Sequence, residues 1–207
     1  MIEQRSEEWF ALRRGKVTAS RVADVVAKTK TGWGASRANY MAELIAERLT
    51  GNTAESYTNA AMQWGIDTEP QARSAYQFYT DAIIEQIEFI DHPRIAMSGA
   101  SPDGLIGTDG MVEVKCPNTA THIDTLLGQE IPGKYITQMQ WQMACAGRAW
   151  CDFVSYDPRL PESMRLLRLR VSRNDALIAS LEKDVTEFLS DLDRRVQALQ
   201  TRYGQAA

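Results

Sequence analysis

Hydrophobic residues recur three or four positions apart through the first part of the chain, a spacing typical of amphipathic helices. Helices are predicted over residues 6–14, from residue 18, over 36–51 and over 59–80. Ser6 is the expected N-cap of the first, Gly51 should end the third, and Pro70 should interrupt or kink the fourth. Residues 28–35 are rich in lysine and glycine and predict a flexible basic loop that exposes Trp33.

The hydrophobic period changes after residue 80. Residues 83–90 alternate and predict a strand, and residues 97–115 predict a β-meander with its last strand over 111–115. A helix is predicted over 135–146, strands over 150–156 and 164–171, and a long amphipathic helix over 175–200. This order predicts an α/β fold with a central mixed β-sheet flanked by helices. No repeat or linker divides the chain, so one domain over residues 1–207 is expected.

Composition narrows the class of protein. No run approaches the length of a membrane span, and the N-terminus lacks the pattern of a signal peptide, so we expect a cytoplasmic protein without membrane contact. The net charge of -4 argues against a protein that coats nucleic acid, but not against an enzyme with one basic groove. Three scattered cysteines and two isolated histidines, His92 in a turn and His122 in a polar loop, do not form a disulfide framework or metal cluster.

The strongest chemical signal joins the turn Ser101-Pro-Asp-Gly104 to the strand that contains Glu113, Val114 and Lys115. Glu113 and Lys115 should share one face of that strand while Val114 points into the opposite layer, because side chains alternate along a strand. The hairpin should bring Asp103 beside Glu113. Two converging carboxylates suit Mg²⁺, and an adjacent lysine can orient a water molecule or stabilise charge on a phosphorane. A turn alone, or Glu-x-Lys alone, would mean only a turn and a solvated face, but together they favour phosphodiester hydrolysis.

These residues resemble the PD-(D/E)xK nucleases, whose core is restriction-endonuclease-like, and more closely the phage lambda exonuclease or YqaJ-type viral recombinase family. The resemblance rests on ordered motifs along nearly the whole chain. They are Trp9-x-x-x-Arg13-x-Gly15, Thr18-Ala-Ser20, Trp64-Gly65-x-x-x-Glu69, Ser101-Pro-Asp-Gly104, Glu113-x-Lys115-Cys-Pro117, Gln138-x-Gln140 and Tyr156-Asp-Pro-Arg159.

The resemblance implies a role for each residue at the metal centre. Asp103, Glu113 and the carbonyl of Val114 would bind Mg²⁺, with two ions in all and Mn²⁺ able to substitute, and Lys115 would be the catalytic lysine. Glu69 would support the second ion, although a surface glutamate is an equal reading and Pro70 could shift its helix. Gln138 would be an active-site glutamine.

The helix that carries Gln138 contains two further glutamines. Gln142 shares the face of Gln138 at i+4, whereas Gln140 does not. The Gln138 and Gln142 pair could equally form a solvated stripe on this helix.

The resemblance also implies how DNA ends are bound. Arg13 would bind the 5′-phosphate, with Ser20 adding donors at a helix start, and Met62 would be the wedge that splits the terminal base pair. A surface arginine and a core methionine are the ordinary alternatives. Residues 1–80 would bind the DNA end, 81–171 would form the catalytic sheet and active-site helix, and 172–207 would add a C-terminal helix.

The predicted function is a Mg²⁺-dependent 5′→3′ exonuclease that digests one strand of double-stranded DNA and leaves 3′ overhangs for phage-type recombination. The family implies a ring-shaped homotrimer and a single-strand annealing protein as partner, in the bacterial host cytoplasm if the gene is phage- or prophage-borne. The alternatives are an endonuclease or single-strand nuclease with the same site, which would cut closed circles or single strands, and an inactive DNA-binding module. An interaction protein built on the helix over 175–200 is a weaker reading, since no sustained heptad marks a coiled coil.

Overall fold

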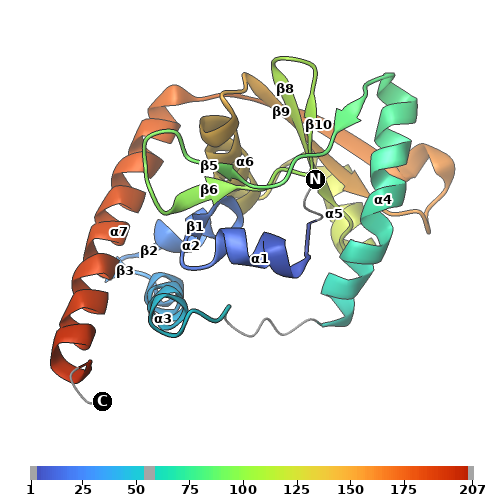
Figure 1. Cartoon of the computed structure of the whole chain (residues 1–207). Helices are drawn as coiled ribbons and strands as arrows, with labels where there is room; N and C mark the ends of the chain where they lie inside the picture. Colours follow the sequence, from blue (N-terminus) through green and yellow to red (C-terminus); the bar gives the residue numbers. More distant parts are fainter. Residues whose placement is uncertain (1–3, 54–58, 205–207) are drawn as a thin grey trace.

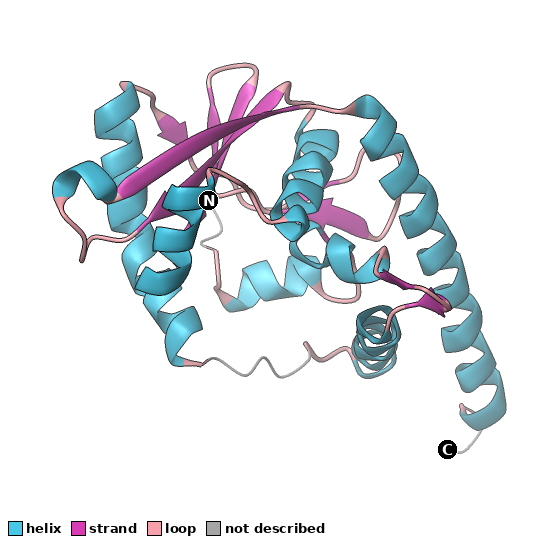
Figure 2. Ribbon diagram, turned by 180° about the vertical axis from the view of Figure 1, so that it is seen from behind, coloured by secondary structure: helices cyan, strands magenta, loops and turns pink. Residues whose placement is uncertain are grey.

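The structure, a computed structural model, describes residues 4–53 and 59–204. A five-stranded mixed sheet in the order β10-β9-β8-β7-β4 forms its centre, and a three-stranded sheet, β1-β6-β5, lies beside it. Figure 1 shows α4 on one side of the molecule and α7 along the opposite side, and Figure 2 shows the same arrangement from behind. Among the described residues, no helix has the length and apolar character needed to cross a bilayer.

The helical elements have the following bounds: α1 (Glu7–Arg13), the 3₁₀ turn η1 (Ala19–Arg21), α2 (Val22–Val25), α3 (Ala35–Thr50), α4 (Ala60–Thr80), α5 (Thr119–Gly128), α6 (Gly133–Ala146), the 3₁₀ turn η2 (Glu162–Met164) and α7 (Asp175–Tyr203). The strands are β1 (Val17–Thr18), β2 (Lys28–Thr29), β3 (Gly32–Trp33), β4 (Ile84–Glu85), β5 (Ile90–Asp91), β6 (Ser98–Ala100), β7 (Gly104–Ile106), β8 (Gly110–Lys115), β9 (Trp150–Tyr156) and β10 (Leu166–Ser172).

Strand β8 occupies the middle of the large sheet. It runs parallel to β9, with Glu113 opposite Phe153, and antiparallel to β7, with Val112 opposite Gly104. Its side chains alternate between two apolar layers. Met111 joins a cluster that includes Met139 and Met143 of α6, while Val112 and Val114 join one that includes Ala72 and Tyr76 of α4. The sheet is therefore covered on both faces, and the prediction of a central mixed sheet between helices is confirmed.

A second core holds the N-terminal helices against α7. Tyr40 and Leu44 of α3 pack with Phe188 and Leu192 of α7, and Trp141 of α6 joins the same cluster. The rings of Tyr40 and Phe188 stack with centroids 5.9 Å apart. Because α6 contributes to this core and to the sheet cluster, it fixes the helical part relative to the strands.

Several local predictions are confirmed in detail. The Ser6 side chain accepts a hydrogen bond from the Trp9 N–H, as an N-cap does, and Gly51 ends α3 in the left-handed conformation at φ +68°. The predicted strand over residues 150–156 is β9, and the long C-terminal helix is α7.

Two predictions about the N-terminal half are wrong in part, although Trp33 is exposed as predicted. Residues 28–35 do not form a flexible loop, because β2 and β3 pair and the Trp33 ring stacks on the guanidinium of buried Arg37, 3.8 Å from its centroid. Pro70 does not interrupt α4, which runs as one helix from Ala60 to Thr80. Packing of buried residues on both sides of Pro70, among them Glu69 and Ala72, outweighs the lost backbone hydrogen bond.

The strand predictions between residues 83 and 100 are also partly wrong. The predicted strand over 83–90 is two separate strands, since β4 pairs with β7 in the large sheet and β5 pairs with β6 in the small one. The predicted meander is split in the same way, because β6 lies in the small sheet and only β7 and β8 form a hairpin. Alternation in the sequence indicates extended chain but does not identify the sheet that each piece joins.

Both histidines are buried, although His92 lies, as predicted, in the turn between β5 and β6. His92 stacks on Trp141 with ring centroids 4.8 Å apart. His122 lies in α5, a helix that was not predicted, and its ring nitrogens contact Ser155 Oγ at 2.7 Å and the Met164 carbonyl at 2.8 Å. These contacts give both ring nitrogens of His122 a partner within the protein.

Candidate active site

The β7–β8 hairpin places Asp103 beside β8, the strand that carries Glu113 and Lys115. Asp103 directly precedes β7, and its Oδ2 accepts a hydrogen bond of 2.6 Å from the backbone N–H of Val114 on β8. The next residue must be small, since a Cβ on Gly104 would lie 2.1 Å from the Ile84 side chain of β4. Gly104 therefore lets β4 pack against the strand that begins at the candidate carboxylate.

Glu113 is almost completely buried, and three side-chain nitrogen atoms donate hydrogen bonds to its carboxylate. Gln138 Nε2 donates to Oε1 and Gln142 Nε2 donates to Oε2, each at 2.6 Å, and Lys115 Nζ also bonds Oε1. The two glutamines are one helical turn apart on α6, so a single helix face orients both carboxylate oxygens. Gln140 points elsewhere, bonding the Ser172 carbonyl and accepting from the Asn174 N–H.

The charges of this cluster are strongly coupled. Burial and the nearby carboxylate of Glu113 raise the pKa of Asp103 well above its usual range, although the Lys115 ammonium opposes this shift. For Lys115, burial favours the neutral amine, but Glu113 and Asp103 outweigh burial and raise its pKa above the ordinary value. The Lys115 side chain is therefore a cation at neutral pH, and the two carboxylates form a region in which added positive charge is stabilising.

The donor set fits a hard divalent cation. The carboxylates of Asp103 and Glu113 and the backbone carbonyl of Val114 offer only oxygen, which Mg²⁺ prefers. Over residues 4–53 and 59–204, no group of three or more His, Cys, Asp or Glu side chains is arranged to hold a metal ion. Glu69 does not complete such a group, because its two oxygens bond Arg73 and Arg5.

Arg13 and the turn before Asp103 form a second feature of the site. Arg13 donates to Ser101 Oγ at 3.1 Å, its guanidinium lies 4.0 Å from the Trp9 ring centroid, and Trp9 Nε1 donates to the same Ser101 Oγ at 3.0 Å. Burial lowers the pKa of Arg13 to about 10, so it keeps its charge at neutral pH. Ser101, two residues before Asp103, thus links the Arg13 side chain to the turn that carries Asp103. The sequence indicated this link only by placing both residues in motifs of the same family.

A pocket of about 250 Å³ opens beside Arg13. Its lining includes basic and hydroxyl side chains, namely Arg13, Arg14, Lys16, Thr18, Ser20 and Arg21, together with two glutamates, Glu43 and Glu47, so basic residues outnumber acidic ones four to two. Ser20 lies in η1, is exposed, and lines the same pocket as Arg13. Such a lining suits an anion, and a phosphate in particular.

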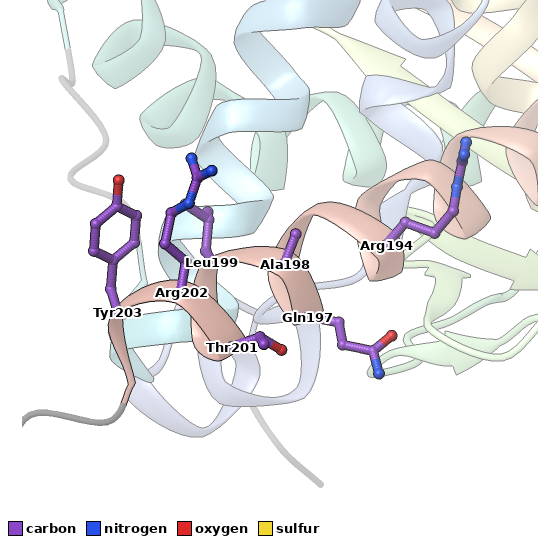
Figure 3. A pocket seen from close by; sticks show the side chains of 7 residues that line it. All are labelled: Arg194, Gln197, Ala198, Leu199, Thr201, Arg202 and Tyr203. Carbon is purple, nitrogen blue, oxygen red and sulfur yellow. The ribbon is translucent and has the colours of Figure 1, made fainter.

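Met62 lies in the first turn of α4, where the Asn59 side chain caps the helix by accepting from the Met62 N–H. Its side chain is 56% exposed, which excludes the core reading for this methionine within the single chain. A separate hollow lies at the end of α7, where Figure 3 shows Leu199, Arg202 and Tyr203 projecting from the same side of the helix.

The sequence profile of the YqaJ-like viral recombinase domain matches residues 8–149, more than half of the chain. The chain belongs to the YqaJ-like viral recombinase family. The match includes Arg13, Asp103, Glu113 and Lys115, and it ends just before β9. No curated protein matches the chain.

Solved structures agree with this YqaJ-like assignment. The chain is similar to LHK-Exo, an alkaline exonuclease from Laribacter hongkongensis, at 53% identity and a TM-score of 0.91, covering 98% of this chain and 100% of that one. LHK-Exo in complex with dAMP matches at the same identity with a TM-score of 0.92. A phage-related exonuclease from Haemophilus somnus 129PT shares the fold at 16% identity, with a TM-score of 0.74 over 92% of this chain and 99% of that one. The predicted family and fold are confirmed.

Proposed function

We propose that this YqaJ-family chain, a DNA exonuclease by its family and its 53% identity to an alkaline exonuclease, digests one strand of double-stranded DNA 5′→3′ with Mg²⁺. The observation that carries the proposal is the cluster in which Lys115 and the two α6 glutamines converge on Glu113 while Asp103 bonds the intervening strand. The product would be a duplex with a 3′ single-stranded overhang.

Each residue of the cluster around Glu113 would have its own role in the hydrolysis of the phosphodiester. Asp103, Glu113 and the Val114 carbonyl would hold Mg²⁺, which when bound supplies a more acidic water and charge stabilisation at the phosphate. Gln138 and Gln142 keep the Glu113 carboxylate in one orientation, so little reorganisation is needed at the reacting phosphate. Lys115 stays protonated beside Glu113, and this favours charge stabilisation and water orientation over proton abstraction as its role.

The Arg13 pocket supports the 5′→3′ direction. A half-buried arginine with a planar fork, held by Ser101 and Trp9, is suited to bind a terminal phosphate through two oxygens. Ser20 and the surrounding lysine and arginines would add donors. LHK-Exo was solved in complex with dAMP, a deoxynucleoside monophosphate, which is the kind of product that an exonuclease of either direction releases.

The remaining assignments follow the family. Exposed Met62 would act as the wedge at the DNA end, Glu69 would support a second ion, and Mn²⁺ would replace Mg²⁺. One domain would serve this function, with the helices up to α4 holding the DNA end and the sheet with α6 holding the catalytic groups. A homotrimeric ring in the host cytoplasm would enclose the duplex, and a single-strand annealing protein would receive the overhang.

Direction and metal requirement are tested together on linear duplex DNA labelled at one 5′ or one 3′ end. With Mg²⁺ we expect early release of the 5′ label as a mononucleotide, late release of the 3′ label, no release with EDTA, and no cutting of a closed circle. Early release of the 3′ label would reverse the proposed direction. Cutting of the circle would identify an endonuclease, and equal activity with EDTA would contradict the proposed metal requirement.

A further inference from the structure

The N-terminal segment reaches the active site before α1 begins. Gln4 Nε2 donates to the Pro102 carbonyl at 3.0 Å and to the Ile87 carbonyl at 3.3 Å, so it is tied to the turn that holds Asp103. Arg5 follows with φ +75°, a left-handed backbone conformation that residues other than glycine rarely adopt. Ser6 then caps α1. We refer to Gln4 and Arg5 as the N-terminal strap.

Arg5 of the strap places its positive charge against Glu69 of α4. Arg5 Nη2 bonds Glu69 Oε2 at 2.8 Å, and Arg73, one turn along α4, bonds the other oxygen, Oε1. Glu69 is buried, and each of its two carboxylate oxygens bonds one guanidinium. In this arrangement Glu69 can accept a metal ion only if one of the two arginines moves away.

Glu69 lies near the proposed metal site. Arg5, which bonds Glu69, directly follows Gln4, which bonds the Pro102 carbonyl next to Asp103. Gly65, one turn before Glu69 on α4, is also close to β8, since a Cβ there would lie 4.0 Å from the Cys116 carbonyl. A cation on Glu69 therefore lowers the negative potential that a second metal ion would meet near Asp103.

Of the two arginines, Arg5 is the one suited to leave. Arg73 is on the same helix as Glu69 at i+4 and its side chain is 19% exposed, whereas the Arg5 side chain is 43% exposed. An exposed guanidinium loses little on returning to water, and the ion pair of an exposed group is weak. Arg5 also stands in a backbone conformation that disfavours its side chain.

We propose that Arg5 is a displaceable counter-ion: it holds Glu69 while the second metal position is empty and must release Oε2 before Glu69 can bind a divalent ion. The inference rests on the proposed metal-dependent function and deepens it. The N-terminal strap then sets the metal concentration at which the second position fills, and Arg5 acts as a positioning residue through Glu69. Removal of its charge should tighten metal binding, opposite to the loss expected for a residue that binds DNA.

The test measures Mn²⁺ binding to the DNA-free protein by calorimetry and by the electron paramagnetic resonance signal of free Mn²⁺. Arg5→Gly removes the charge and suits the left-handed backbone, so folding should be retained. We expect the second ion to bind about threefold to tenfold more tightly in this variant, with Arg5→Lys close to the wild type. Arg14→Gly is the matched control, since it removes the same charge from a residue that bonds Thr53.

The outcomes separate this inference from the proposed function. Unchanged second-ion affinity in Arg5→Gly, or an equal gain in Arg14→Gly, would overturn the counter-ion role even if the first ion binds and is lost in Asp103→Asn. A gain that persists in an Arg5→Gly, Glu69→Gln double variant would also overturn it. Absence of Mn²⁺ binding from the wild-type protein would overturn the metal centre itself, and the counter-ion role with it.

Discussion

Gln142 offers the sharpest single perturbation of the candidate site. Its Nε2 donates to Glu113 Oε2 at 2.6 Å, while its own Oε1 is buried with no hydrogen-bond partner among the described residues. In Gln142→Met the bond to the carboxylate is lost, a loss of about 1.5–3 kcal/mol for a charged acceptor. If that interaction serves the transition state, kcat falls about 10- to 150-fold.

Stability should change much less than activity. Replacement of Gln142 also removes its unpaired buried carbonyl, which costs about 1–3 kcal/mol, so the two contributions to the free energy of unfolding largely cancel. The matched control is Gln140→Met on the same helix, because Gln140 bonds the Ser172 carbonyl and the Asn174 N–H away from Glu113. That variant should lose stability and keep kcat.

The assay is steady-state release of nucleotides from linear duplex DNA, with urea unfolding of both variants in parallel. A kcat in Gln142→Met within a factor of two of the wild type would refute the view that Glu113 must be held by both glutamines. So would equal losses of kcat in the Gln142 and Gln140 variants, since that pattern would mean a general disturbance of α6.

Three further outcomes are expected. Arg13→Ala should raise KM for 5′-phosphorylated ends about tenfold or more and leave 5′-hydroxyl ends unchanged, measured with paired substrates; an equal effect on both would remove the phosphate role. Burial raises the pKa of Asp157, but hydrogen bonds from Arg159 and Thr119 outweigh burial and lower that pKa to about 2. Up to about 2 kcal/mol of stability is therefore present above pH 4 and is lost as the pH falls towards 2. In Asp157→Asn the free energy of unfolding in urea should depend less on pH over that range, and an unchanged pH dependence would contradict the linkage. Burial, with the charges of Glu69 and Asp103, raises the pKa of the Cys116 thiol to about 12. Iodoacetamide at pH 8 should therefore leave both Cys116 and the nuclease activity intact. Rapid alkylation of Cys116 in the folded protein, detected by mass spectrometry, would contradict this expectation.

Much of the site's geometry could be anticipated from local rules. Strand alternation places Glu113 and Lys115 on one face with Val114 on the other, and the i+4 rule pairs Gln138 with Gln142, as the hydrogen bonds show. These relations depend only on the period of one strand or one helix. The turn before β7 was likewise marked by its own residues, so the contact of Asp103 with β8 follows from the hairpin.

Relations between distant segments could not be read in this way. The contacts of Ser101 with Arg13 and Trp9, and of Arg5 with Glu69, join residues 64 or more positions apart along the chain. The stacking of Trp33 on Arg37 likewise depends on how α3 meets the β2–β3 pair, and this turned a predicted flexible loop into ordered strands. Such contacts depend on tertiary packing, which no local period encodes.

Lys115 gives the most direct test of whether the cluster around Glu113 is the catalytic centre. Lys115 Nζ and Lys134 Nζ lie 5.1 and 4.8 Å from the Tyr135 ring centroid, so the two lysines share a neighbour although only Lys115 bonds Glu113. The measurement is the rate of Mg²⁺-dependent nucleotide release from linear duplex DNA by the wild type, Lys115→Met and Lys134→Met, each shown to be folded by circular dichroism. We expect the rate to fall about a hundredfold or more in Lys115→Met and to stay close to the wild-type rate in Lys134→Met. Wild-type activity in folded Lys115→Met would contradict this expectation.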